Sequence, residues 1–350
     1  YYLGGLGNDT IVATAATSTT IYGGSSLTTT DGDDFVDING VVSKTQIFGN
    51  QGKDTIDVAD TLNASSILGG AGNDTIILQD DAISKSSVAG GADNDSISIA
   101  GTVTGTSSVI GEAGADTILV AGDLADYAKV DGGAGNDKLT VEGDAGENTS
   151  ILGGAGEDSV TVSGAFSKAL IYGNEDDDSI YVIGGATASS IYGGAGNDLV
   201  SVGGGVTNDY LFGNSGDDSF ILGGAVTDTT VDVGNGADSL ALGADALNKV
   251  VTVTGALTST SITGGAGIDT IYLKGAVSNA SISSAAGADS LYFSGTANNT
   301  TIVGGAGADT VSLSGANDFL VLKGVTNDYV FAGSGSDTLS VTGDTAARAT

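Results

Sequence analysis

The sequence contains no cysteine, histidine, proline, methionine or tryptophan among its 350 residues. Without cysteine there can be no disulfides and no thiolate metal sites, and without histidine as well the usual zinc chemistry is excluded. The absence of histidine also removes the commonest general base. No run of about 18 apolar residues occurs, so we expect no membrane insertion. The chain opens at Tyr1 without an initiator methionine or a signal peptide, and we expect it to be a segment or processed product of a longer chain.

Positive charge is also scarce, because 10 lysine and arginine residues face 43 aspartate and glutamate residues, for a net charge of −33. A polyanion of this kind does not bind nucleic acid or an anionic membrane through its own charge, but it can bind cations. Hydrophobic residues make up 40% of the chain, its mean hydropathy is +0.18, and its acids are evenly spaced. These properties favour a folded, cation-binding protein over a disordered acidic tail.

Glycine, in contrast, accounts for 59 residues and recurs in a six-residue motif that ends in aspartate, as in Gly69-Gly70-Ala71-Gly72-Asn73-Asp74. Successive motif aspartates lie mostly 20 or 21 residues apart. A period held over this length predicts a repeat architecture. The motif aspartates are Asp9, Asp34, Asp54, Asp74, Asp95, Asp116, Asp137, Asp158, Asp178, Asp198, Asp218, Asp238, Asp269, Asp289, Asp309 and Asp337.

Apolar residues keep a fixed phase relative to each aspartate. Ile76 and Leu78 follow Asp74 by two and four residues, Ile67 precedes it by seven, and the other repeats are alike. Alternation with period two predicts strands with one buried face, and each period holds two such strands and two turns. We therefore expect an all-β fold, a single parallel β-solenoid over residues 1–350 with two short strands per coil of about 20 residues. A β-sandwich of chance regularity would need hairpins of irregular length.

Two intervals break the period, 31 residues from Asp238 to Asp269 and 28 from Asp309 to Asp337. In the first, Lys249 aligns with the aspartate position, and in the second Asn317–Gly324 aligns with a turn and strand. Each interval reads as an extra half-coil, near residues 239–255 and 310–324. We expect the acidic turns to change edges after about residue 243 and to change back after about residue 315. A locally three-stranded coil is the alternative.

The chemistry of the acidic turn points to a hard cation. Glycine adopts positive φ at no steric cost, and such turns direct several backbone carbonyls inward. Two stacked turns offer these carbonyls and two carboxylates, an all-oxygen set that suits Ca²⁺ better than Mg²⁺. The predicted ligands are carboxylates and turn carbonyls of Asp34, Asp54, Gly69, Ala71, Asp74, Asp95, Asp116, Gly132, Ala134, Asp137, Gly153, Ala155, Asp158, Asp178, Gly193, Ala195, Asp198, Asp218, Asp238, Gly264, Ala266, Asp269, Asp289, Gly304, Ala306, Asp309 and Asp337.

Some turns depart from the motif and are expected to bind calcium poorly or not at all. These weaker turns are Ala89–Asp95, Gly173–Asp178, Gly234–Asp238 and Ser284–Asp289.

Gly153–Thr161 reads GGAGEDSVT, which resembles residue for residue the RTX, or hemolysin-type, calcium-binding repeat GGxGxDxUx. Gly69–Ile77, Gly132–Thr140, Gly193–Ser201, Gly264–Tyr272 and Gly304–Ser312 match it as well. The resemblance extends over nearly the whole chain and implies a β-roll with calcium between successive turns, in a protein secreted by bacteria. RTX rolls typically repeat every nine residues with calcium at both edges. This chain has an acidic turn at one edge of each coil, so we expect one column of ions, apart from the edge exchange.

A stripe of large apolar residues, six positions before successive aspartates, is expected to face outward: Phe48, Leu68, Ile110, Leu152, Tyr172, Tyr192 and Phe212. An exposed stripe of this size marks an interface, although stacking that supports the sheet would explain it equally well. Neither end of the repeat has an obvious cap, which favours head-to-tail association as well as lateral association.

These features favour a calcium-stabilised structural protein, secreted to the cell surface as a bacterial surface layer, sheath or extracellular filament. Self-association is the expected interaction, with a cell-surface polysaccharide as a further candidate partner. The alternative is an RTX calcium-binding module of a larger secreted adhesin, toxin or enzyme. An ice-binding surface is less favoured, because alanine occupies the turn position where threonine would be needed. We expect no enzymatic activity, since no unique cluster of base, nucleophile and oxyanion donor occurs.

Overall fold

The computed structural model describes residues 1–25, 31–79, 83–244, 248–314, 318–323, 329–331, 338–342 and 348–349. The chain divides into two compact units, Tyr1–Ser179 and Ile180–Thr350, and each is a parallel β-solenoid. Within these described ranges there is no helix, and hence none long and apolar enough to cross a membrane. The predicted all-β solenoid with coils of about 20 residues is therefore confirmed.

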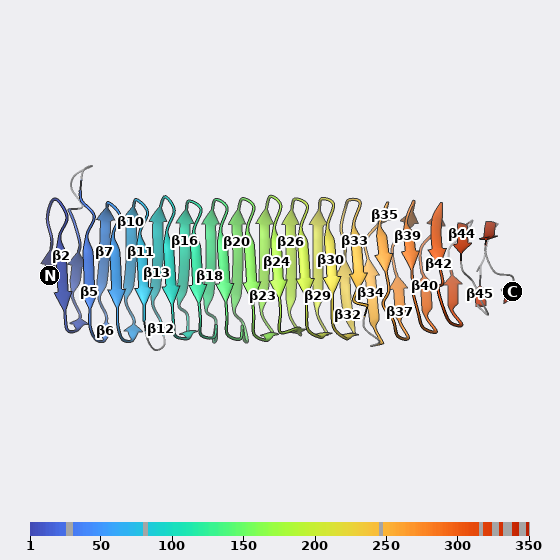
Figure 1. Cartoon of the computed structure of the whole chain (residues 1–350), viewed down its shortest axis with the longest axis horizontal. Helices are drawn as coiled ribbons and strands as arrows, with labels where there is room; N and C mark the ends of the chain where they lie inside the picture. The colour runs from blue at the N-terminus through green and yellow to red at the C-terminus, as the bar shows by residue number, and fades with distance from the viewer. Residues whose placement is uncertain are drawn as a thin grey trace. The chain divides into compact units, whose positions relative to one another are not determined.

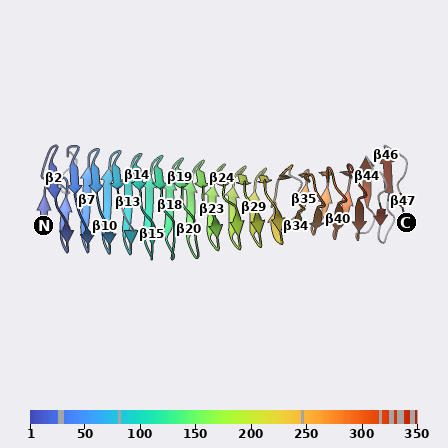
Figure 2. The same ribbon diagram turned by 60° about the horizontal axis from the view of Figure 1, so that its bottom comes forward.

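Two parallel sheets form the long walls of the first unit, and each strand pairs with its equivalents in neighbouring coils (Figures 1 and 2). Sheet A contains β1 (Tyr2–Leu3), β4 (Thr20–Tyr22), β7 (Gln46–Gln51), β10 (Ser66–Ala71), β13 (Ser87–Ala92), β16 (Ser108–Ala113), β18 (Lys129–Ala134), β20 (Ser150–Ala155) and β23 (Leu170–Glu175). Sheet B contains β2 (Thr10–Ala13), β5 (Phe35–Ile38), β8 (Thr55–Val58), β11 (Thr75–Leu78), β14 (Ser96–Ile99), β17 (Thr117–Val120), β19 (Lys138–Val141) and β21 (Ser159–Val162). β24 (Ser179–Val182) runs across the division between the units.

The second unit has the same two kinds of wall. Its sheet A strands are β26 (Ser190–Ala195), β29 (Tyr210–Ser215), β32 (Thr229–Asp232), β34 (Val250–Thr254), β37 (Thr270–Leu273), β40 (Ser290–Phe293), β43 (Thr310–Leu313), β45 (Tyr329–Phe331) and β47 (Arg348–Ala349). Its sheet B strands are β27 (Leu199–Val202), β30 (Ser219–Leu222), β33 (Ser239–Leu242), β36 (Ser261–Thr263), β39 (Ser281–Ser283), β42 (Thr300–Val303), β44 (Phe319–Lys323) and β46 (Thr338–Thr342).

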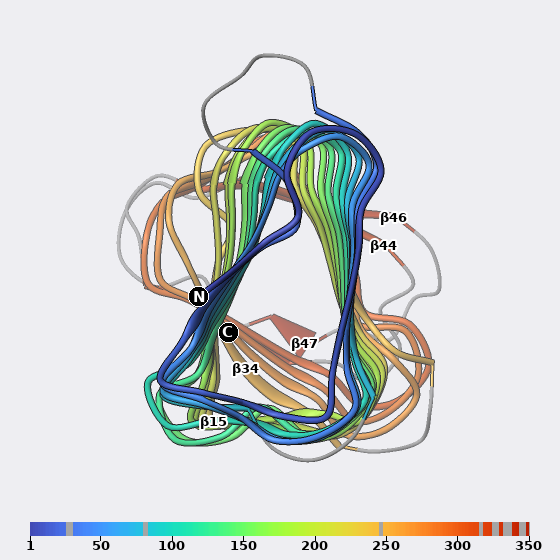
Figure 3. The same cartoon turned by 90° about the vertical axis from the view of Figure 1, so that its left-hand side faces the viewer.

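The expectation of two strands per coil is incomplete, because the uncharged turn contains a third, two-residue strand that forms a short wall of the coil (Figure 3). These strands pair in parallel from coil to coil within each unit. They are β3 (Ala16–Thr17), β6 (Val42–Ser43), β9 (Leu62–Asn63), β12 (Ile83–Ser84), β15 (Val103–Thr104), β22 (Phe166–Ser167), β25 (Ala186–Thr187), β28 (Val206–Thr207), β31 (Val226–Thr227), β35 (Leu257–Thr258), β38 (Val277–Ser278) and β41 (Ala297–Asn298). Only one apolar residue per strand points inward, too few for a period-two pattern.

The core lies between the three walls and is built from ladders of aliphatic side chains. In the coil of Asp74, Ile67 of sheet A, Ile76 and Leu78 of sheet B and Ile83 of the short wall are all buried. Each such residue stacks on its equivalent one coil away, as Ile67 does on Ile47. Burying one of these side chains contributes about 1.5–3 kcal/mol, and the ladder repeats this contribution in every coil.

The acidic turns of the second unit change edges, as the strand pairing shows. Asp218 and Asp238 each lead from sheet A into sheet B, into β30 and β33. The next strand, β34, pairs with β32 and β37 in sheet A, so that Asp269 leads from sheet B into sheet A. The order reverts at β44, which pairs with β42 and β46 in sheet B. Each extra half-coil therefore exchanges the edge, because its strand, β34 or β44, joins one of the two long walls.

The apolar stripe on the outer face of sheet A is less exposed than expected. All seven of its predicted members are half-buried. Tyr192 and Phe212 stack with ring centroids 4.7 Å apart. Ala89 and Asp131 occupy stripe positions in the first unit and interrupt it there. The stripe therefore faces outward as predicted, but its residues are half-buried and it is interrupted in the first unit.

Candidate metal centre

The acidic turn has a backbone that few residue types can adopt. We number its six positions from the first glycine to the aspartate, so that Gly69 is position 1 and Asp74 position 6. Positions 2 and 4 have positive φ, 127° at Gly70 and 113° at Gly72. The weaker turns keep this conformation without glycine, with φ of 89° at Asn174 and 75° at Asp93. The turn shape is therefore a property of the stacked coils and persists where glycine is replaced.

The position 6 aspartates form a continuous ladder in which each contacts the coil before it. Asp54 N donates to Asp74 Oδ1 at 2.8 Å, and Asp74 N donates to Asp95 Oδ1 at 2.7 Å. The aspartates so linked in the first unit are Asp9, Asp34, Asp54, Asp74, Asp95, Asp116, Asp137, Asp158 and Asp178. The second unit links Asp198, Asp218 and Asp238, and, at the other edge, Asp269, Asp289 and Asp309. Asp337 lies outside the described residues.

The second carboxylate oxygen is where a cation fits. In Asp54, Asp74, Asp116 and Asp137, Oδ2 is buried and has no hydrogen-bond partner among the residues that the structure describes. A buried carboxylate oxygen without a partner is costly, and a bound cation would remove that cost.

Backbone carbonyls meet these oxygens from the next coil. A Cβ placed on Gly132 would lie 2.4 Å from both Asp137 Oδ2 and Gly153 O, and one placed on Gly69 would lie 2.4 Å from Asp74 Oδ2 and 2.6 Å from Gly90 O. Position 1 is therefore glycine because the space above its Cα is shared by a carboxylate and a carbonyl oxygen. No three acidic side chains converge on one point in the described part of the chain, so the remaining ligands would be carbonyls or water, as calcium accepts.

Four of the predicted alanine carbonyls accept hydrogen bonds between coils. Ala71 O accepts a hydrogen bond from Gly52 N at 2.9 Å, and Ala134 O and Ala155 O accept from Gly114 N and Gly135 N at 2.8 and 2.6 Å. Ala306 O likewise accepts from Gly287 N. These carbonyls join the inter-coil ladder, with one lone pair left for other contacts. The structure thus brings together the aspartates and the position 1 carbonyls more directly than the alanines.

Two turns replace the position 1 glycine and do not fit an ion in the same way. Val233 occupies it in the turn of Asp238 and is fully buried. Ser284 occupies it in the turn of Asp289, and its hydroxyl donates to Gly304 O at 2.6 Å. In both turns a side chain fills the space that glycine leaves open elsewhere. These are two of the turns that the sequence indicated as weak.

A second ladder, at position 5, was missed by sequence reasoning. Ala115 N donates to Asn94 Oδ1 at 2.8 Å, and Asp217 N donates to Asn197 Oδ1 at 2.8 Å. These side chains point toward the following coil, opposite to the aspartate ladder, and satisfy the backbone N–H of the next position 5. The sequence signal for this ladder is the asparagine that often precedes the motif aspartate, as in Asn73-Asp74 and Asn197-Asp198.

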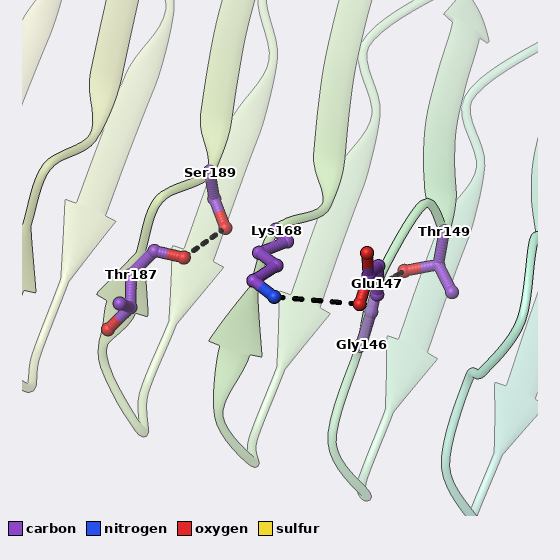
Figure 4. Close-up of polar contacts among 6 residues, drawn as sticks. All are labelled: Gly146, Glu147, Thr149, Lys168, Thr187 and Ser189. Carbon is purple, nitrogen blue, oxygen red and sulfur yellow. Dashed lines mark hydrogen bonds and ion pairs between the residues drawn. The ribbon is translucent and has the colours of Figure 1, made fainter.

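The return segment, which leads from sheet B to sheet A, has a ladder of small polar residues that was also missed. Thr45 N donates to Ser65 Oγ, and Ser65 N to Ser86 Oγ, both at 3.1 Å. The hydroxyls in turn bond to carbonyls of their own coil, as Thr149 Oγ1 does to Gly146 O and Ser189 Oγ to Thr187 O (Figure 4). This corner satisfies most of its polar groups without an ion, and Thr260 Oγ1 is an exception.

Burial raises the pKa of the ladder carboxylates. The pKa of Asp54 and of Asp137 is about 7, and that of Asp74 is about 8. Desolvation is the largest cause, and the neighbouring carboxylates add to it, whereas the hydrogen bond from the preceding aspartate N–H acts in the opposite direction. Metal binding requires the ionised form, so a cation has to outcompete these protons.

Buried carboxylates that lack a partner, backed by carbonyl oxygens in coil after coil, define a cation-binding β-solenoid. The family profile of the RTX calcium-binding nonapeptide repeat matches residues 61–82, 172–206, 204–225, 294–323 and 324–341. These segments contain RTX calcium-binding repeats, and several calcium ions bind along the coils.

A comparison with curated proteins finds no match. Among solved structures, a hyperactive, Ca²⁺-dependent, β-helical antifreeze protein from an Antarctic bacterium is similar at 22% identity, with a TM-score of 0.47. The match covers 87% of this chain and 85% of the other.

Replacing the position 2 glycine of a turn should test its backbone. Gly154 has φ of 128°, and a Cβ there would lie 1.9 Å from Gly133 O. We expect Gly154→Ala to lower the free energy of unfolding in calcium by about 1–3 kcal/mol. Gly154→Asn should cost less, because Asn50, Asn174 and Asn214 adopt positive φ at this position. The matched control is Gly146→Ala, where the nearest atom is Leu124 O at 3.5 Å. Equal loss from Gly154→Ala and Gly146→Ala would contradict the assignment.

The pKa values predict an unusual pH dependence in the absence of calcium. The folded carboxylates of Asp54, Asp74 and Asp137 have pKa values of about 7, 8 and 7, against an ordinary value of 3.8. The folded state therefore binds more protons than the unfolded state, and its stability falls as pH rises. In chelator, the urea midpoint should be highest near pH 4 and should decrease as pH rises through 6 to 8. A midpoint in chelator that is equal or higher at pH 8 would refute this.

Proposed function

We propose that this chain is an extracellular structural protein, a calcium-stabilised component of a bacterial surface layer, sheath or filament. The observation that carries the proposal is the repetition of one ion-binding turn in almost every coil, with no unique constellation of groups in the part of the chain that the structure describes. A repeated surface suits repeated contacts with identical copies, whereas catalysis needs one differentiated site. We infer that the chain has no catalytic role.

Calcium would hold successive coils together. Neighbouring carboxylates in adjacent coils are separated by about 4.8 Å. At that spacing two charges repel by roughly 1 kcal/mol in water, and by more where they are partly buried. A cation between the coils turns this repulsion into attraction. The extracellular space supplies calcium at concentrations that such sites can use, which supports the proposed location.

The outer face of sheet A is the proposed contact surface. In the second unit Tyr192 and Phe212 stack there, and farther along the same sheet Tyr272 and Tyr292 stack at 5.1 Å. Rigid aromatic side chains give large contact area at low entropic cost. A second copy of the chain, placed laterally, is the proposed partner.

Cell-surface polysaccharide is the second proposed partner, and the return segment offers a surface for it. An open groove of about 510 Å³ lies in the first unit, lined by hydroxyl side chains and by Lys44 and Lys85. Hydroxyl groups suit hydrogen bonding to sugars, and the two lysines suit acidic ones. Lys168 forms an ion pair with Glu147 at 3.5 Å in the same kind of segment (Figure 4).

The role of the ladder carboxylates can be tested with Asp137→Asn. The new amide keeps an acceptor for Asp116 N, and its Nδ2 can donate to Gly153 O. In chelator, we expect this variant to be more stable than wild type, because one buried charge is gone. In calcium, it should bind at least one ion fewer and be less stable. Urea unfolding with and without calcium, together with equilibrium dialysis, measures both effects.

The matched control is Glu142→Gln, which removes the same charge from an exposed position. Loss of stability in both conditions, or an unchanged number of bound ions, would show that Asp137 is not a calcium ligand.

Assembly can be followed by electron microscopy of the purified chain. In calcium we expect ordered filaments or sheets that dissolve on chelation. Phe212→Ser should weaken assembly without changing the number of bound calcium ions. Ile221→Ser, an equally apolar change on the outer face of sheet B, is the control. Isolated particles at all concentrations would refute the structural role and favour the alternative, a calcium-binding module of a larger secreted protein.

A further inference from the structure

Lys249 occupies a ladder position that belongs to aspartate elsewhere. Its N–H donates to Asp269 Oδ1 at 3.0 Å, and its carbonyl accepts from Thr270 N at 2.7 Å. These are the contacts that each position 6 aspartate makes with the next coil. Lys249 is therefore the first member of the exchanged column, followed by Asp269, Asp289 and Asp309.

The side chain of Lys249 is completely buried, with 0% of its surface exposed. A Cβ placed on Gly265, position 2 of the following acidic turn, would lie 3.0 Å from Lys249 Nζ. Gly265 N in turn donates to Asp269 Oδ2 at 3.2 Å. The ammonium group therefore lies against Gly265, in the turn of Asp269.

A buried ammonium group is unfavourable by several kcal/mol unless negative charge and oxygen acceptors surround it. The Asp269 turn supplies a buried carboxylate at this place. In the first unit, the corresponding gaps have a carboxylate on both sides and need an added cation. At this gap the ammonium group of Lys249 replaces one of the two carboxylates. Its positive charge balances the negative charge of Asp269, so no added cation is required.

The aspartate column of the second unit that ends at Asp238 has a bulky side chain in its last turn. Asp238 is its last acidic member before the exchange, and Val233 fills position 1 of that turn. In the next coil Ser261 N donates to Asp238 O, and the residue before it is the buried Thr260. One column therefore stops at an apolar side chain, and the other begins at an ammonium group.

We propose that Lys249 is a tethered cation that takes the place of Ca²⁺ in the gap that precedes the Asp269 turn. The exchange of edges is thereby stable without an ion, and the second calcium column starts one gap later. The inference rests on the proposed calcium-binding role of the aspartate ladder. The inference concerns only the gap at Lys249, so it can be tested separately from calcium binding in the rest of the ladder.

Two variants of the full chain test the proposal. Lys249→Asp converts the gap into one with carboxylates on both sides, and equilibrium dialysis should show one additional calcium ion per chain. Lys249→Met keeps the apolar stem and removes the charge. In chelator, its urea midpoint should fall below that of wild type, and hydrogen exchange should increase at β34 and β37. Lys274→Met, at an exposed lysine one strand away, is the matched control and should leave both measurements unchanged.

An unchanged calcium number in Lys249→Asp would overturn the proposal if that variant folds in calcium. If it does not fold, the decision falls to Lys249→Met, and a chelator midpoint equal to that of Lys274→Met would overturn it. A wild-type chain that binds no calcium would instead refute the function of the ladder. The chelator measurements on Lys249→Met would still report on the ammonium group.

Discussion

The structure depends on how each buried aspartate of the ladder finds hydrogen-bond donors or a cation, because the neighbouring coils present the same carboxylate. Each ladder aspartate uses one oxygen to accept the N–H of the preceding aspartate, which fixes the register between coils. Its other oxygen is directed into the gap toward the next coil, where it meets a carbonyl. Hydrogen bonds cannot complete this arrangement, because carboxylate and carbonyl are both acceptors. The ionised form of the ladder therefore needs a cation in most coils, whereas a protonated carboxyl can donate its O–H to the carbonyl.

The two edges of a coil solve the same stacking problem in different ways. At the acidic edge the polar groups are completed by an ion, and two positions of the turn have positive φ, mostly at glycine or asparagine. At the return edge, serine and threonine hydroxyls accept from the neighbouring coil and donate within their own. Asp209 shows the difference, since it lies at the return edge and both its oxygens accept backbone N–H groups, from Ser189 and Thr207. Burial raises its pKa to about 6, yet it needs no ion.

The exchange of edges in the second unit shows that the two solutions are interchangeable. An extra half-coil places the acidic turn at the opposite edge, and small polar residues follow at the edge that it leaves. Val233 and Lys249 lie at this junction, one apolar and one cationic. Lys249 supplies a positive charge where the second column begins, whereas Asp238 Oδ2, beside Val233, stays buried without a hydrogen-bond partner among the described residues. Position 1 is not glycine in the turns of Asp238 and Asp289, where the side chains of Val233 and Ser284 occupy that place.

The sequence by itself determined the coil, the core and the acidic ladder, because the 20-residue period, the aliphatic alternation and the aspartates are all local and repeat in phase. It also indicated the edge exchange, because an interval that is half a coil too long moves the next acidic turn to the opposite edge. The short third wall was not predictable, because a two-residue strand such as β6 leaves one inward residue and no periodicity. Only the tertiary structure decided which oxygen of each aspartate is free for a cation, that the alanine carbonyls bond to the preceding coil, and that Lys249 is buried against an acidic turn. Those properties arise from contacts between residues 20 apart in the chain, and the register that sets them is a product of stacking.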